Sequence, residues 1–459
     1  MTEEKEKYPS TFTIDNFSST TKLESNEVKV PVGSKETLND YNPFDHRQLE
    51  HPNSTFGALA HLLKSSLGTG ILAMPNAFKN GGLLFGFIGT LLVGIVCTHC
   101  VHILVKASHK ICRKAKTPSF GFSETAEAVF EYGPENLKRF APAARVTVDI
   151  ALVVTYYMGI CVYVVFVSGS IQQLVDYYYP DLNWSVQMYM VIILPLLILI
   201  CQVRELKYLV PFSMLANIFL VISFAITLYY MFNGSFTMEG KNLMAPISRI
   251  PLFLSTVVFA MEGIGLVMPV ENNMKKPHHF LGCPGVLNTA MATVVVLYGV
   301  IGFFGYLKYG EATEGSITYN LPVDEILAQV VKCLVALAIF FTYSLQFYVA
   351  YSITWGITGK HISTKFHNLT QIVLRTLLVS MTVGVAALVP DLEPIIGLVG
   401  SICLSMLGIF IPAVVDTVIS WEGELGTLKW KLWKNIALML FALFALISGS
   451  YESILGLMK

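Results

Sequence analysis

The chain has 459 residues, of which 54% are hydrophobic and only 14% are charged, and its mean hydropathy is +0.60. So few charges could not cover a soluble globule of this length, whereas a surface that faces lipid must be apolar. The formal net charge of zero gives no indication of a nucleic-acid partner. Eight cysteines lie mostly in apolar runs, without the spacing of a zinc site or a disulfide framework. These properties predict an integral membrane protein.

The first 50 residues differ from the rest in charge and hydropathy. Ten Asp and Glu against six Lys and Arg give residues 1–50 a net charge of −4. Such a segment buries too little apolar surface to fold alone, so we expect a disordered cytoplasmic tail. Tyr41-Asn-Pro-Phe44 contains a Tyr-x-x-apolar string and an Asn-Pro-Phe string, which are forms of endocytic sorting signals. Endocytic adaptors are the partners that these strings predict, and chance occurrence is the alternative.

Residues 51–459 are predicted to form one polytopic all-α membrane domain. A helix needs about 20 apolar residues to cross the hydrocarbon core, and lipid offers no partner to the open backbone of a strand. Eleven stretches meet this length, near 56–79, 82–105, 146–176, 186–203, 206–231, 250–271, 286–307, 325–355, 374–390, 393–416 and 435–456.

The distribution of Lys and Arg predicts the orientation of these helices. With a cytoplasmic N-terminus, the inner loops contain 18 Lys and Arg and the outer loops five. An excess of cationic residues marks cytoplasmic loops, so we expect this orientation in a multi-pass protein. The sequons at Asn183 and Asn233 then fall outside, where glycosylation is expected, whereas the sequon at Asn368 falls inside.

Two of the predicted helices are interrupted near their middle. The first contains Gly68-Thr-Gly70 and the sixth contains Glu262-Gly-Ile-Gly265, each followed by a proline within five residues. Breaks at corresponding positions five helices apart are typical of a 5+5 inverted repeat with its binding site between discontinuous helices 1 and 6. The predicted parts are a first repeat at about 56–231, a second at about 250–416 and an extra helix at about 435–456.

Such a break can bind an amino acid through its backbone. Unwinding leaves N–H groups at the start of a half-helix, where the helix dipole favours a carboxylate, and glycine lets a ligand approach closely. Carbonyl groups freed on the opposite half-helix can accept hydrogen bonds from the ammonium group. We expect Phe259 to limit the size of the side chain. The expected substrate-binding residues are Ser65, Gly68, Thr69, Gly70, Phe259, Glu262, Gly263 and Gly265.

Each of these residues also has a structural interpretation. Glycines are common in membrane helices because they allow close packing, and the hydroxyls of Ser65 and Thr69 could simply satisfy freed carbonyls. A charge in the membrane costs on the order of 3 kcal/mol, so Glu262 requires an explanation. It could contact the substrate amine, carry a proton, or hold the unwound backbone.

A histidine provides a second group that could carry a proton. His61 lies two turns before Gly68 and one turn before Ser65, and an imidazole titrates near neutral pH, as proton coupling requires. The alternative for His61 is a position near the cytoplasmic interface. No motif that cradles phosphate is present, so ATP-driven transport has no support.

The two breaks carry a resemblance to a known family. His61-Leu-Leu-Lys followed by Gly68-Thr-Gly-Ile-Leu72, together with Phe259-Ala-Met-Glu-Gly-Ile-Gly265 and Pro269-Val-Glu-Asn-Asn-Met274, resembles the proton-coupled amino acid transporter family of the amino acid/auxin permease group. The likeness covers about residues 50–456, and Tyr41-Asn-Pro-Phe-Asp-His46 suggests an insect member. The resemblance implies the inverted-repeat fold and symport of protons with glycine, alanine and proline. It also implies proton coupling at His61 and His99.

The chain departs from the family in one respect. Mammalian relatives have an external disulfide, whereas no cysteine lies in the predicted outer loops of this chain, so residence at the plasma membrane or in endosomal-lysosomal membranes stays open. We expect a proton symporter of small neutral amino acids that needs no cofactor, is linked to nutrient sensing and growth signalling, and is not an enzyme. A sensor without bulk transport and a sodium-coupled carrier are the alternatives, because a fold does not choose the ion.

Overall fold

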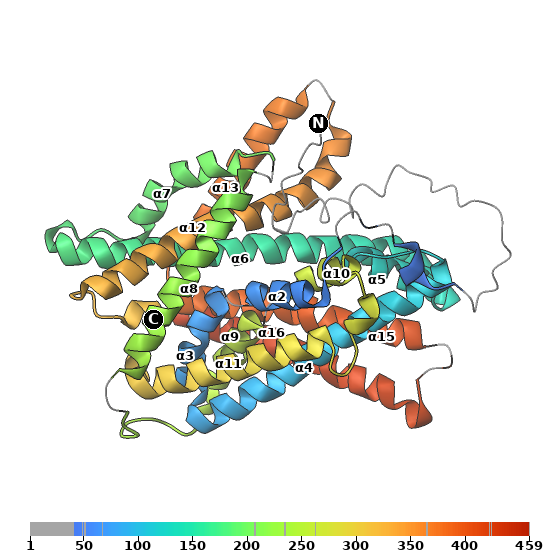
Figure 1. Cartoon of the computed structure of the whole chain (residues 1–459), viewed down its shortest axis with the longest axis horizontal. Helices are drawn as coiled ribbons and strands as arrows, with labels where there is room; N and C mark the ends of the chain where they lie inside the picture. The colour runs from blue at the N-terminus through green and yellow to red at the C-terminus, as the bar shows by residue number, and fades with distance from the viewer. Residues whose placement is uncertain are drawn as a thin grey trace, which may run out of the picture.

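A computed structural model describes residues 41–47, 49, 52–66, 68–205, 208–233, 236–261, 263–363, 366–421, 423 and 425–458. Apart from one isolated bridge between Asn53 and Met274, the regular structure of these residues is helical (Figure 1). The α-helices are α2 (Thr55–Ser66), α3 (Thr69–Gly81), α4 (Leu83–Ala115), α5 (Phe122–Glu131), α6 (Ala141–Tyr178), α7 (Val186–Cys201), α8 (Val210–Phe232), α9 (Ile250–Ala260), α10 (Ile264–Asn272), α11 (Val286–Tyr309), α12 (Ile326–Thr358), α13 (His367–Leu388), α14 (Leu392–Leu398), α15 (Ile411–Ser420) and α16 (Trp430–Leu457).

The prediction of about eleven membrane helices is confirmed. Nine helical segments of the described chain are long and apolar enough to cross a membrane, and α7 is a shorter apolar helix. The tenth predicted span consists of α14, two π-helical turns at Val399–Leu404 and Met406–Phe410, and α15. Helices α2 and α3 together form the first span, which is divided at Gly68 as the sequence predicts.

The helices pair as an inverted repeat requires. Helix α3 packs against α9, α4 against α11, α6 against α12, and α7 against α13. Each pair joins corresponding helices of the two predicted repeats, namely the first and sixth, second and seventh, third and eighth, and fourth and ninth. The 5+5 fold class predicted from the two breaks is therefore confirmed.

Glycines set how closely the helices around the break approach. A Cβ atom on Gly86 would lie 2.9 Å from the Phe78 ring, and one on Gly89 would lie 2.7 Å from the Phe253 ring. Small residues allow such contacts between membrane helices. Both glycines of α4 therefore serve packing, which brings α4 against α3 and α9.

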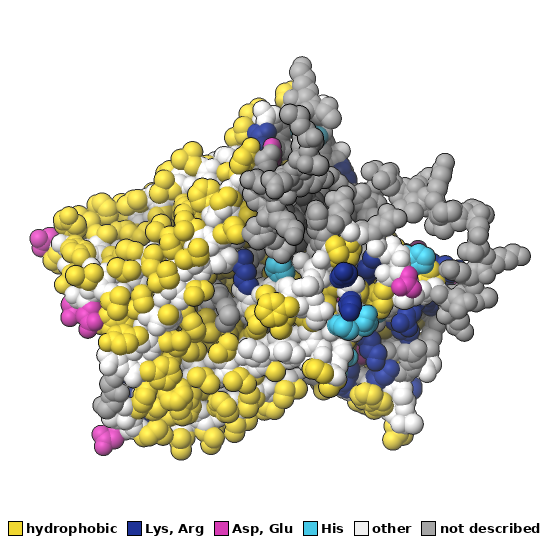
Figure 2. Space-filling view, in the orientation of Figure 1, with side chains coloured by type: hydrophobic (Ala, Val, Ile, Leu, Met, Phe, Trp, Pro, Cys, Tyr) yellow, Lys and Arg dark blue, Asp and Glu magenta, His cyan; other side chains and the backbone are white. Residues whose placement is uncertain are grey.

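Apolar side chains cover the middle of the bundle, and the charges gather at its two ends (Figure 2). Ile95, Val191, Ile218 and Leu377 are among the large apolar side chains that are more than half exposed. Lys, Arg and His gather at the end where α5 and α10 lie, which we call the basic end (Figures 1 and 2). The opposite end carries the loop that follows α11, with Glu311 and Glu314, and we call it the acidic end.

The chain before α2 packs against the basic end. Residues 1–40 of the tail lie outside the described part of the chain, whereas Tyr41–Arg47 are described and include a short 3₁₀ helix, η1 (Pro43–His46). Asn42 caps this helix by accepting a hydrogen bond from the Phe44 amide, and Pro43 is buried. The last part of the segment expected to be disordered therefore has a defined place on the bundle.

The loop predicted between the second and third spans also contains structure. Helix α5 begins at Phe122, and the Glu124 side chain in its first turn accepts from the Gly121 amide at 2.7 Å. Its buried face includes Phe122, Ala126 and Val129, and packs against α6. The stretch is too short and too polar to appear as a span in the sequence.

Candidate functional site

The two helix breaks lie beside each other at the centre of the bundle. In the first span α2 ends at Ser66 and α3 begins at Thr69, and in the sixth α9 ends at Ala260 and α10 begins at Ile264. A Cβ atom on Gly70 would lie 2.8 Å from Cα of Ala260, so the backbones of α3 and α9 nearly touch. Gly70 is required for this approach.

One hydroxyl links the ends of both half-helices. Tyr298 of α11 is fully buried, and its hydroxyl contacts the carbonyl of Ser66 and lies 2.9 Å from the carbonyl of Ala260. These carbonyls end α2 and α9, where the last four carbonyls of a helix lack intrahelical donors. A hydroxyl carries one proton, so the two carbonyls share it.

A cavity lies between the two breaks. It offers about 50 Å³ to the centres of water-sized molecules, and roughly 10–15 Å³ of such space holds one water. Its size therefore fits a few waters or a small polar solute. The walls come from five spans: Ser65, Ser66, Gly68, Thr69 and Gly70; Leu152, Thr155, Tyr156 and Tyr163; Phe259, Ala260, Gly263, Ile264, Gly265 and Leu266; Gln346; and Leu404 and Leu407.

The structure brings together seven of the eight residues expected to bind substrate. Ser65, Gly68, Thr69, Gly70, Phe259, Gly263 and Gly265 all line this cavity. Glu262, the eighth, lies outside the described residues. The hydroxyls of Ser65 and Ser66 donate to the carbonyl of Leu62 at 2.8 and 3.2 Å, so only their lone pairs are left for a ligand.

The two histidines expected to carry protons lie in different places. His61 is half-buried on α2, one turn before Ser65 and hence on the approach to the cavity from the basic end. His99 lies on α4 and accepts a hydrogen bond at Nε2 from Nζ of Lys434, 3.0 Å away. Lys434 also pairs with Asp416 at 3.2 Å. A lysine can donate to Nε2 only while that nitrogen has no proton, so protonation there would break this contact.

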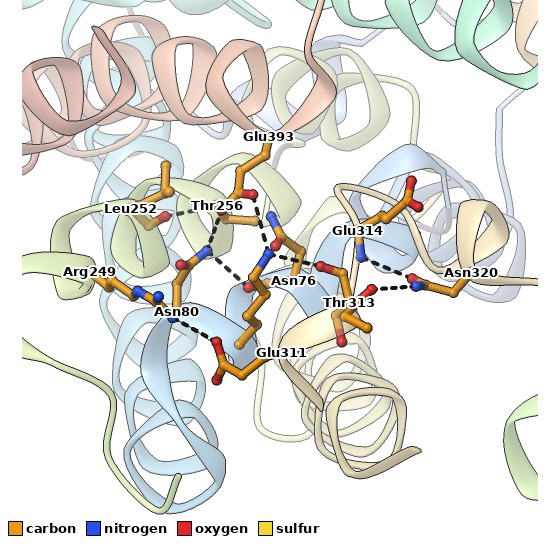
Figure 3. A network of polar contacts seen from close by, with 12 residues as sticks. Asn76, Asn80, Arg249, Leu252, Thr256, Glu311, Thr313, Glu314, Asn320 and Glu393 are labelled. Carbon is orange, nitrogen blue, oxygen red and sulfur yellow. Dashed lines mark hydrogen bonds and ion pairs between the residues drawn. The ribbon is translucent and has the colours of Figure 1, made fainter. Parts of the chain in front are cut away.

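Polar contacts close the acidic end of the bundle above the cavity (Figure 3). Glu393 at the start of α14 accepts from Asn80 of α3 at 2.7 Å and lies 3.7 Å from Nζ of Lys79. Lys79 also donates to the carbonyl of Thr313 at 2.9 Å. Beside them Arg249, before α9, pairs with Glu311 at 2.9 Å. These contacts join α3, α9 and α14 to the loop after α11.

A buried lysine also binds the loop that follows α11. Lys332 of α12 is 1% exposed and donates to the Gln173 side chain at 2.7 Å and to the carbonyl of Thr318 at 2.8 Å. Glu314 lies in this loop, and burial raises the pKa of its carboxyl group. Lys332 is therefore a structural cation that fixes the loop against α6.

A second set of contacts closes the basic end. Glu271, near the end of α10, is fully buried and accepts from Arg47 at 3.1 and 3.3 Å and pairs with Nε2 of His109 at 2.8 Å. Backbone bonds link Asn53, just before α2, to Asn273 at 2.8 Å and to Lys275 at 2.9 Å. The halves of both broken spans that lie at the basic end, α2 and α10, are thus bound to each other, to α4 and to the N-terminal segment.

Sequence reasoning did not find Tyr298, Arg47, His109 or Glu271 as parts of the site. Tyr298 lies 232 residues from Ser66, and Arg47 lies 224 residues from Glu271. Two signals single out Glu271: it belongs to the motif Pro269–Met274, and it is a carboxylate near the end of a predicted span, where charges usually pair.

Replacing Tyr298 with Phe tests the link between the two breaks. The change leaves the carbonyls of Ser66 and Ala260 without their shared donor, which should lower the free energy of unfolding by about 1–3 kcal/mol. Thermal unfolding of the purified protein in detergent measures the effect. Tyr451→Phe is the control, because Tyr451 is 62% exposed on α16. Equal melting temperatures for the two variants would contradict the link.

Two alanine substitutions distinguish a glycine that packs two helices together from a glycine that lines the cavity. In Gly70→Ala the methyl group would lie 2.8 Å from Ala260 and should cost about 1–3 kcal/mol of stability. In Gly68→Ala the methyl group meets no atom within 4 Å, so the protein should keep its melting temperature. Binding of a small solute by Gly68→Ala should weaken, because the methyl group occupies part of the cavity. The assignment fails if Gly68→Ala unfolds earlier than Gly70→Ala.

Comparison with known proteins identifies the family. The family model described as Transmembrane amino acid transporter protein matches residues 51–455. The Drosophila melanogaster Proton-coupled amino acid transporter-like protein pathetic is 42% identical over 422 residues, which cover 92% of this chain and 89% of that protein. Probable amino acid transporter skat-1 of Caenorhabditis elegans is 26% identical over 456 residues, covering 94% and 96%.

Two solved structures are similar to this one at lower sequence identity. One is MhsT in complex with L-phenylalanine, with a TM-score of 0.47, 14% identity and coverage of 88% of this chain and 100% of that one. The other is a substrate-bound, outward-open Na⁺-coupled sialic acid symporter, with a TM-score of 0.38, 12% identity and coverage of 91% and 92%.

The resemblance first drawn from the two helix breaks, including its insect branch, is confirmed by these sequence matches. A family model that covers nearly the whole apolar domain, and a close relative of almost equal length, leave no room for an enzymatic assignment. The chain belongs to the transmembrane amino acid transporter family.

Proposed function

We propose that the protein is a symporter that moves small neutral amino acids, of the glycine, alanine and proline class, together with protons. The observation that carries this proposal is the small cavity between the two helix breaks. Seven of its lining residues are those that the sequence predicts to bind substrate, and its size suits a compact zwitterion. The name of the Drosophila relative supports protons as the coupling ion.

The substrate carboxylate binds at the start of α3. Thr69 and Gly70 belong to its first turn, whose N–H groups have no acceptor within the helix and lie at the positive end of the helix dipole. Gly68 presents no side chain, so an anion can reach these groups. The neighbouring Gly263 likewise has no atom within 4 Å of its Cβ position, which leaves the start of α10 open to the same ligand.

The ammonium group faces the end of α9. Carbonyls around Phe259 to Gly263 accept its hydrogen bonds, and Glu262 contributes its carboxylate in this proposal. The ring of Phe259 is 3% exposed and lines the cavity, where it limits the side chain of the substrate. A methyl group or a pyrrolidine ring fits this space, whereas a large aromatic side chain does not.

The contacts at the two ends support alternating access as the mechanism. The cavity lies between the pairs Lys79–Glu393 and Arg249–Glu311 at the acidic end and the pair Arg47–Glu271 at the basic end. Breaking one set while the other holds would open the cavity to one side only. The basic end faces the cytoplasm in this proposal, because Lys and Arg gather there (Figure 2) and an excess of these residues marks cytoplasmic loops.

The same orientation places both sequons outside the cell or in the lumen of an organelle. Asn183 and Asn233 are both exposed at the acidic end. A role in nutrient and growth signalling remains part of the proposal, with the plasma membrane or endosomal-lysosomal membranes as its location.

Uptake by proteoliposomes tests the proposal. Radiolabelled alanine and proline should accumulate in sodium-free vesicles only when an inward proton gradient is imposed, and a protonophore should abolish the accumulation. Binding without accumulation would indicate a sensor. Accumulation that follows a sodium gradient instead would indicate a sodium-coupled carrier, and either result would overturn proton symport.

Substitution of the histidines tests how protons couple. His61→Gln should flatten the dependence of uptake on external pH, because the imidazole that titrates near neutral pH is lost. His99→Gln should change the same profile if protonation at His99 breaks its contact with Lys434. His102→Gln is the control, since His102 lies one turn further along α4. An unchanged profile in His61→Gln would refute its assigned role.

A further inference from the structure

A second and larger hollow lies on the flank of the bundle. This groove, of about 760 Å³, runs between α4 and α11 on one side and α15 and α16 on the other, at the basic end. Its floor is tight, because a Cβ atom on Gly94 would lie 2.3 Å from a methyl group of Val295. None of the residues that line the central cavity lines the groove.

The wall of the groove is apolar along one part of its length and polar and charged along the other. Leu91, Ile95, Val295 and Val296 line one part. The other part carries the polar and charged residues His99, His102, Lys106, Lys110, Asp416, Trp430, Lys431 and Lys434. Ile95 is 65% exposed and Val296 is 56% exposed, so the apolar part opens onto the surface that faces lipid.

The charges of the groove favour an anion. Four lysines face it against one carboxylate, Asp416, which is already paired with Lys434 and accepts from Asn435 at 2.9 Å. Lys110 donates to the carbonyl of Ile419 at 3.3 Å, which directs it across the groove toward α15. The described residues of the groove therefore leave a cationic excess that no protein carboxylate among them offsets.

The dimensions match one leaflet of a bilayer. Ile95 and Lys106 are 11 residues apart on α4, which corresponds to about 16 Å at 1.5 Å per residue. Half of a hydrocarbon core measures about 15 Å. Trp430 is 53% exposed at the cationic part, and tryptophan collects where the headgroups begin. A headgroup at Lys106 and Lys431 would thus leave an acyl chain along Ile95 and Val296.

We infer that this groove binds an anionic phospholipid from the leaflet at the basic end. The lysines contact the phosphate and further anionic groups of the head, and the apolar part of the groove takes an acyl chain. Basic pockets between membrane helices on the cytoplasmic side are a recurring form of lipid site. A soluble anion would use the lysines and leave the apolar half of the groove empty.

Lipid binding to the full-length protein tests this inference without any transport assay. Native mass spectrometry of the detergent-purified protein would titrate phosphatidylserine, phosphatidylinositol 4,5-bisphosphate and phosphatidylcholine with the same acyl chains. We expect the anionic lipids to bind at least tenfold more tightly than phosphatidylcholine. Lys106→Gln with Lys431→Gln should weaken anionic lipid at least about tenfold, since each lysine near an anionic membrane surface is worth on the order of fivefold.

The matched control is Lys275→Gln with Lys276→Gln. Both lysines are exposed at the basic end, and neither lines the groove. Melting temperatures without added lipid show that both double variants fold. Equal binding of phosphatidylcholine, or an equal loss in the control, would overturn the inference. Competition by glycerophosphoinositol bisphosphate, which has the headgroup without acyl chains, at the affinity of the whole lipid would overturn it in favour of a soluble-anion site.

Discussion

The satisfaction of backbone hydrogen bonds in an apolar interior is the constraint on which the rest of this structure depends. A continuous helix meets that requirement alone, and a broken one does not. The protein breaks two spans at its centre, and Tyr298 supplies a shared donor to the carbonyls at which both first halves end. The residues at the start of α3 and α10, Gly68 to Gly70 and Gly263 to Gly265, then line the cavity between the breaks.

Close packing fixes the two breaks against each other. Gly70 allows α3 to touch Ala260, and in the tenth span the position of a Cβ on Gly400 lies 1.9 Å from the carbonyl oxygen of Ser255 on α9. The π-helical turn Val399–Leu404, which contains Gly400, and the next one, Met406–Phe410, bring Leu404 and Leu407 to the same cavity. Large side chains at these glycines would push the half-helices apart. The cavity needs the two breaks close together, so such substitutions would disrupt the site.

Local sequence patterns predicted much of this arrangement, because hydropathy and helix breaks are local properties. The spans, the breaks at Gly68 and near Gly263, and the part of the cavity wall that these breaks contribute follow from runs of a few tens of residues. Contacts between segments that lie far apart in the sequence cannot be predicted from such local patterns. Lys434 lies 335 residues from His99, and nothing in either helix alone indicates that they meet. The fixed place of Tyr41–Arg47 likewise depends on a carboxylate more than 200 residues away.

The contact between Arg47 and Glu271 has a consequence for how the cell could recognise the protein. Pro43 is buried, and the Phe44 ring lies between the guanidinium of Arg47, 5.1 Å away, and the ring of His109, 5.0 Å away. Pro43 is therefore enclosed, and Asn42 and Phe44 are only partly exposed, while these contacts hold. Any partner that reads this tripeptide in an extended form would first have to break the pair of Arg47 and Glu271 and draw Pro43 away from the bundle.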